Sequence, residues 1–133
     1  MTKDDLHEKG LAMRTALFGE AFQTRLNAGT YDADPMMRKF RDVALENVFG
    51  ALWTRPGLDL KTRTLVCVVT DVATGREPEL ALHLRMALRQ GWTEDELTET
   101  MLHMSGYVGV PLIREAMLAA SKVFAAVRAE SAD

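Results

Sequence analysis

The sequence predicts an all-α protein of about six helices. Apolar residues recur at roughly helical spacing along most of the 133 residues. Short breaks containing glycine or proline divide this pattern, and no convincing hairpin signal occurs. The length fits a single domain over residues 1–133, so we expect the helices to form one bundle.

The first helical pattern runs from Asp4 to about Leu26. Gly10 and Gly19 interrupt it, so we expect one broken helix or two short ones. Residues 28–35 contain glycine, aspartate and proline and predict a loop.

The next helix is predicted from Pro35 to about Phe49. Asp34 is a good N-cap, and proline is favoured at the first helical position. Residues 50–57 are expected to form a loop, because Pro56 biases Arg55 away from helical geometry. Such a loop can present side chains such as Arg55.

Asp59 and Gly75 bound a third predicted helix that is rich in valine. A strand is the alternative, because β-branched residues favour strands. The pattern lasts about fifteen residues without turn signals, whereas a usual strand has about five or six, so a helix is preferred. This apolar segment should lie centrally in the core.

Three further helices complete the prediction. One runs from about Glu77 to Gln90, with Gly91 as its stop. Residues 93–96 form a capping box that opens the next, which breaks at residues 106–111. The last extends from about Pro111 to Arg128.

Charge and hydropathy argue against two classes of partner. The net charge is -3 and the basic residues are scattered, so no nucleic acid partner is expected. No apolar run reaches the length of a membrane span and the N-terminus lacks a signal-peptide pattern. We therefore expect a cytoplasmic protein with no membrane partner. The single cysteine, Cys67, lies among apolar residues and is interpreted as a structural thiol.

The candidate site is centred on Glu79 and His83. Residues four apart share a helix face, so Glu79 can orient His83 as an acid/base unit. Spacing alone favours an inconsequential surface pair, because such pairs are common and weak. Arg85 could bind a carboxylate, although two positions correspond to about 200 degrees around a helix from His83. Arg55 and Tyr107 are further candidates, and no metal-site or phosphate-loop motif is found.

Five short motifs in register resemble the carboxymuconolactone decarboxylase family. They are Trp53-Thr-Arg-Pro-Gly-Leu58, Thr62-Arg-Thr-Leu65, Glu79-Leu-x-Leu-His-Leu-Arg85, Gly91-x-Thr-x-Asp-Glu96 and Tyr107-x-Gly-x-Pro111. An N-terminal echo, Gly10-x-x-x-Arg14 with Leu17-Phe-Gly19, extends the resemblance to nearly the whole chain.

The resemblance implies an alkylhydroperoxidase D-like helical fold in a ring-forming homo-oligomer, a trimer or hexamer. It also implies decarboxylation of 4-carboxymuconolactone to 3-oxoadipate enol-lactone in protocatechuate catabolism, by the β-ketoadipate pathway, without metal or organic cofactor. The peroxidase branch of the superfamily uses a CxxC pair, and Glu79 stands where a catalytic cysteine would be expected. Thiol peroxidase chemistry is therefore not expected.

The resemblance assigns roles to the candidate residues. His83 is the proton donor or oxyanion stabiliser and Glu79 is its orienting partner. Arg85 and Arg55 bind the carboxylates of a small anionic lactone, and Tyr107 is an auxiliary donor.

The chain departs from the family pattern between Glu46 and Leu52, where Asn47 and Ala51 are atypical. This departure leaves two alternatives open. The chain could be a lyase or isomerase acting on a different small cyclic acid, or a non-catalytic oligomeric binding protein.

Overall fold

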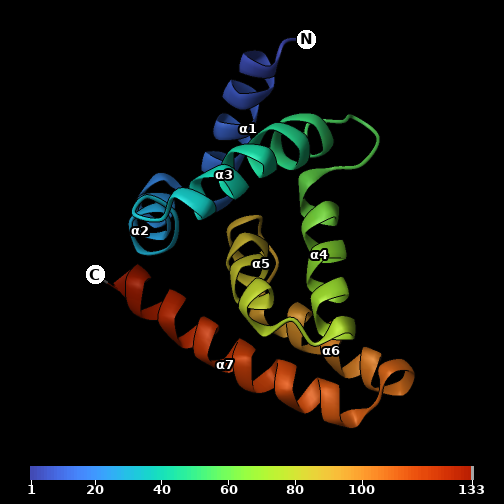
Figure 1. Cartoon of the computed structure of the whole chain (residues 1–133). Coiled ribbons are helices and arrows are strands. Elements are labelled where there is room, and N and C mark those ends of the chain that lie inside the picture. The colour runs from blue at the N-terminus through green and yellow to red at the C-terminus, as the bar shows by residue number, and fades with distance from the viewer. Residues whose placement is uncertain (133) are drawn as a thin grey trace. The chain divides into compact units, whose positions relative to one another are not determined.

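The computed structural model describes residues 1–132, and every element within that range is helical. The helices fall into two compact units, Met1–Leu58 and Asp59–Asp133, which are drawn in Figure 1. The all-α prediction is confirmed. The prediction of one domain over residues 1–133 concerns the association of the two units and stays a prediction.

The N-terminal unit contains three α-helices and two π-helical segments. These are α1 (Lys3–Phe18), α2 (Glu20–Leu26), η1 (Asn27–Tyr31), α3 (Pro35–Ala44) and η2 (Leu45–Leu52). The predicted break falls at Gly19, whose φ of 83° is unfavourable for other residues. The Asp34 side chain accepts a hydrogen bond from the Met36 amide, as expected of an N-cap.

Two predicted loops are partly helical. The amide of Asp32 donates to the Asn27 carbonyl and that of Trp53 to the Val48 carbonyl, at 2.8 and 2.9 Å. Both bonds link residues five apart, which is the π-helical pattern. Residues 28–31 and 50–52 therefore remain helical where the sequence predicted a loop.

Helix α1 packs across η2 through two glycines. A Cβ on Gly10 would lie 1.8 Å from the Leu45 carbonyl oxygen, and one on Gly50 would lie 2.3 Å from that of Leu6. The two backbones thus approach more closely than any side chain permits. Gly10, predicted as an interruption, lies inside α1 and is needed for this contact.

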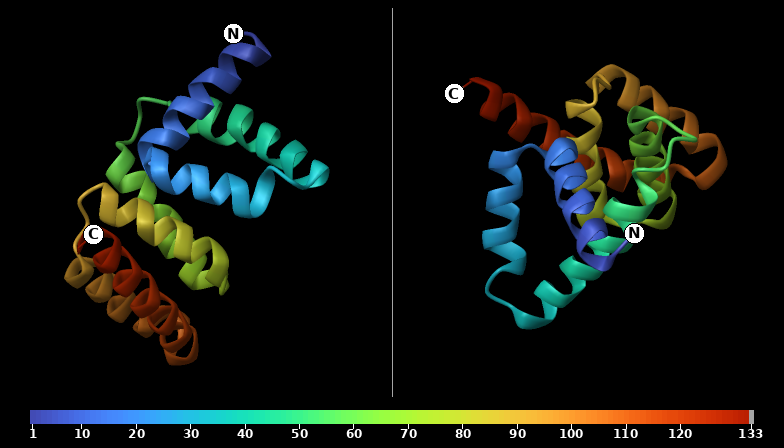
Figure 2. Two further views of the ribbon diagram at one scale, coloured as in Figure 1. Left: turned by 90° about the vertical axis from the view of Figure 1, so that its left-hand side faces the viewer. Right: turned by 90° about the horizontal axis from the view of Figure 1, so that it is seen from above.

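The C-terminal unit consists of α4 (Leu60–Thr74), α5 (Glu77–Arg89), α6 (Glu94–Val108) and α7 (Val110–Ala132). Helix, rather than strand, is confirmed for α4, with the Asp59 side chain accepting from the Thr62 amide. The capping box at the start of α6 is also confirmed. Helix α6 continues to Val108 and ends at Gly109, so the predicted break at 106 falls later. Figure 2 shows α6 and α7 side by side.

The core of the C-terminal unit is formed by one buried face of each helix. Helix α4 contributes Val68 and Val72, at 0% and 1% exposure, which confirms its predicted central position. Other members are Leu80, Leu84, Ala87, Leu97, Met101, Ile113, Ala116, Ala120 and Phe124. Among the described residues, no helix is long and apolar enough to cross a membrane.

Substituting Gly10 by alanine should destabilise the N-terminal unit. The added methyl group forces α1 away from η2, and overpacking of this kind costs about 1–3 kcal/mol. Urea unfolding followed by circular dichroism measures the change. Gly29→Ala is the matched control, because a Cβ there meets nothing within 4 Å. A Gly10→Ala protein as stable as Gly29→Ala would contradict the close contact.

Candidate active site

His83 of α5 is paired with a buried carboxylate from α4. Its Nδ1 lies within hydrogen-bonding distance of Oδ2 of Asp71. Asp71 is only 5% exposed, whereas the His83 side chain keeps 20% of its surface accessible. A buried carboxylate needs such a partner, because burial without one is costly. The pair therefore anchors the imidazole ring while leaving part of it accessible.

The Asp71 carboxylate determines the role of Nδ1. An ionised carboxylate only accepts hydrogen bonds, so the proton between the two groups belongs to Nδ1 of His83, which donates it. Nε2 has no hydrogen-bond partner within residues 1–132. This is the arrangement of an oriented acid/base histidine with one nitrogen held and the other available.

Cys67 lies one turn before Asp71 on α4 and is half-buried. Burial raises the pKa of this thiol to about 11, and the negative charge of Asp71 adds to the effect. The thiol is thus protonated at neutral pH. This agrees with the interpretation of Cys67 as a structural thiol.

The structure gives His83 a different partner from the one expected. Glu79 lies in the first turn of α5, is exposed, and makes no hydrogen bond or ion pair with His83 in the described part of the chain. The expected interaction is made by Asp71 instead. The physical reason is burial, since a carboxylate shielded from water interacts more strongly with imidazole than an exposed one does.

Arg85 points toward α7. Its Nη1 donates to Oε2 of Glu130 at 2.7 Å, in a pair at the protein surface. The guanidinium thus already binds a carboxylate, although one supplied by the chain itself. Its predicted role as a substrate-binding group stays a prediction.

Arg55 and Tyr107 are both exposed. Arg55 belongs to the N-terminal unit and follows η2, with its amide donating to the Leu52 carbonyl. Tyr107, near the end of α6, is 81% exposed and its ring lies 5.3 Å from that of His103. The predicted roles of Arg55 in substrate binding and of Tyr107 as an auxiliary donor stay predictions.

Asp71 is the site residue that sequence reasoning missed. It lies in the apolar run of α4, shortly after Val68 and Val69 and directly before Val72. A lone carboxylate on a core-facing helix requires a partner, and that was the available signal. Within residues 1–132, no group of three or more histidine, cysteine or acidic side chains is placed to hold a metal ion.

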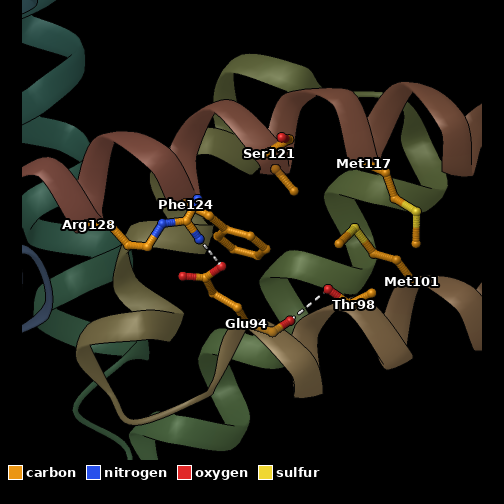
Figure 3. A pocket seen from close by; sticks show the side chains of 8 residues that line it. Glu94, Thr98, Met101, Met117, Ser121, Phe124 and Arg128 are labelled. Carbon is orange, nitrogen blue, oxygen red and sulfur yellow. Dashed lines mark hydrogen bonds and ion pairs between the residues drawn. The ribbon is translucent and has the colours of Figure 1, made fainter.

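A cavity of about 240 Å³ lies between α6 and α7 (Figure 3). Glu94 of α6 and Arg128 of α7 form an ion pair beside it. The remaining lining residues are Thr98, Met101, Met117, Ala120, Ser121 and Phe124. The two charged groups neutralise each other, and the cavity contains no histidine, so His83 is the stronger centre for proton transfer.

Comparison with known proteins assigns the family. The Carboxymuconolactone decarboxylase family matches residues 38–122. The chain is 36% identical to a 4-carboxymuconolactone decarboxylase of Acinetobacter baylyi, over 93% of this chain and 90% of that protein. It is 33% identical to a nitrosuccinic acid decarboxylase of Metarhizium robertsii, over 91% and 85%. This extent of similarity, together with the helical fold, shows that the chain belongs to the carboxymuconolactone decarboxylase family.

Proposed function

We propose that this protein decarboxylates 4-carboxymuconolactone to 3-oxoadipate enol-lactone without a cofactor, with His83 as proton donor or oxyanion stabiliser. Carboxy-lyase activity is supported by the family and by two relatives named as decarboxylases. The observation that carries the site assignment is the His83–Asp71 pair, which holds one ring nitrogen and leaves Nε2 without a partner among residues 1–132.

The chemistry of the substrate makes few demands on the protein. When the bond to the ring carboxylate breaks, CO2 leaves and the electron pair delocalises through the ring to the lactone oxygen. The lactone therefore serves as electron sink, and a proton must then be added to carbon. The protein needs cations for the carboxylates, a donor for the developing oxyanion and an acid for the carbon.

The charged candidates can share these tasks. A guanidinium matches a carboxylate with two parallel hydrogen bonds, so Arg85 and Arg55 suit substrate binding. Arg85 would exchange Glu130 for a substrate carboxylate, which conserves the type of interaction. Glu79, which is exposed on α5, would help to orient His83. Tyr107 would be an auxiliary hydrogen-bond donor.

A different small acid is the second candidate substrate. The relative named nitrosuccinic acid decarboxylase supports it, because its similarity to this chain is almost as high as that of the 4-carboxymuconolactone decarboxylase. The atypical Asn47 and Ala51 lie in η2 and favour the same alternative if this segment contacts substrate.

A homo-oligomer, a trimer or hexamer, is also proposed. Met36, Phe40 and Val43 recur at helical spacing on α3 and are 69%, 58% and 56% exposed. Such an apolar stripe is unfavourable in water and suits contact with a second copy of the chain.

Release of CO2 from freshly generated 4-carboxymuconolactone tests the reaction. His83→Gln should lower kcat by about 100-fold or more, because a positioned acid contributes about 10²–10⁴-fold. Glutamine can still donate to Asp71, which limits damage to the fold. His7→Gln is the control and should keep wild-type activity. An assembled wild-type protein that releases no CO2 would reject this substrate, and an active His83→Gln would reject the role of His83.

The raised pKa of Cys67 predicts slow alkylation. A thiol with a pKa of about 11 is almost fully protonated at pH 8, so iodoacetamide should react about 100-fold more slowly than with the unfolded chain. Mass spectrometry follows the single cysteine, with protein in guanidinium chloride as the control. Equal rates for folded and unfolded protein would show that the thiolate is not suppressed.

Charge placed on the α3 stripe should disrupt the oligomer. Phe40→Asp puts a carboxylate where apolar contact is expected, so the mass measured by light scattering should fall toward the 14.8 kDa of one chain. Lys9→Asp, at an exposed position of α1, is the matched control for the same change of charge. The proposal fails if the wild type is monomeric or if both variants keep the wild-type mass.

A further inference from the structure

Asp71 decides which nitrogen of His83 can exchange a proton. Because Nδ1 donates its proton to the carboxylate, a neutral His83 has its free lone pair on Nε2. In that state Nε2 accepts hydrogen bonds and cannot donate one. A neutral ring in this geometry is therefore a base.

The proposed reaction requires the opposite property. Both roles considered for His83, donation to carbon and stabilisation of an oxyanion, need a proton on Nε2. With Nδ1 already protonated, that state is the imidazolium cation. The cation carries protons on both nitrogens, so Nδ1 can keep its hydrogen bond to the buried Asp71 carboxylate while Nε2 donates to the substrate.

We propose that Asp71 is a positioning residue that holds the Nδ1 proton of His83, so that the imidazolium ring transfers its proton to the substrate from Nε2. This inference rests on the proposed function. After CO2 leaves, Nε2 gives its proton to the substrate carbon and His83 becomes neutral, still bound to Asp71 through Nδ1. A proton from water then restores the cation, so each turnover consumes one proton.

Other charged groups near Asp71 do not replace it. Cys67, on the same helix, is neutral at physiological pH. Arg76, Glu77 and Glu115 line a cavity of about 10 Å³ beside Asp71, with Arg76 before α5, Glu77 in its first turn and Glu115 on α7. None of these groups contacts the His83 ring by a described hydrogen bond or ion pair. Asp71 is thus the charged group that contacts the His83 ring among the described residues.

Nitrogen-15 NMR of the histidine side chains tests the inference without substrate. The chain has three histidines, and His83→Gln identifies the signals of His83. In the wild type, Nδ1 should be protonated in every state. In Asp71→Asn, the side-chain amide can also donate to Nδ1, so neutral rings protonated on Nε2 should appear. A neutral wild-type ring protonated on Nε2 alone, or the same tautomer in both proteins, would overturn the inference.

Kinetics provide the second measurement. Asp71→Asn should lower kcat by about tenfold or more and change KM by less than about twofold, since the substrate-binding groups are untouched. Asp95→Asn, at an exposed position in α6, is the control for the same change and should keep wild-type kcat. Unchanged kcat in Asp71→Asn would overturn the inference. If the wild type does not decarboxylate the lactone, the proposed function fails, and the NMR result alone decides the role of Asp71.

Discussion

The buried carboxylate of Asp71 is the constraint around which the C-terminal unit is organised. A charged group this deep among valines and leucines destabilises the fold unless a partner is held against it. His83 provides that partner and comes from the neighbouring helix, so the pair fixes the register of α5 on α4. Val68, Val72 and Leu84, on the same two helices, belong to the buried apolar core of this unit.

Local signals in the sequence predicted most of the helices. Asp34, Asp59 and the box at Thr93 cap helices where expected, because capping depends on residues within one turn. The errors have a different origin. The π-helical turns occupy residues 28–31 and 50–52, where loops were predicted, because such turns leave no recognisable spacing in the sequence. Gly10 was interpreted as a helix interruption because the sequence does not show why glycine is needed there. It is needed for a tertiary contact, with a carbonyl group 35 positions later.

The same distinction explains the site. His83 and Glu79 were selected because residues four apart are neighbours on any helix, a relation that sequence alone contains. Asp71 lies twelve positions before His83 on another helix, and only the packing of α4 against α5 brings the two together. Arg85 follows the geometry expected from its position, since it faces α7 and pairs with Glu130 there. Helix geometry thus predicted the direction in which the side chain of Arg85 points, and tertiary packing determined which residues Arg85 and His83 contact.

The negative charge of Asp71 also acts on two neighbouring groups, the Cys67 thiol and the His83 ring. Burial raises the pKa of the Cys67 thiol and the Asp71 carboxylate raises it further, while the same carboxylate accepts a hydrogen bond from Nδ1 of His83. A thiol needs its anionic form to attack, whereas an imidazole needs its cationic form to donate. The packing of α4 on α5 places Asp71 in contact with His83 and one turn from Cys67. This arrangement suits proton transfer by His83 and does not suit redox chemistry at the Cys67 thiol.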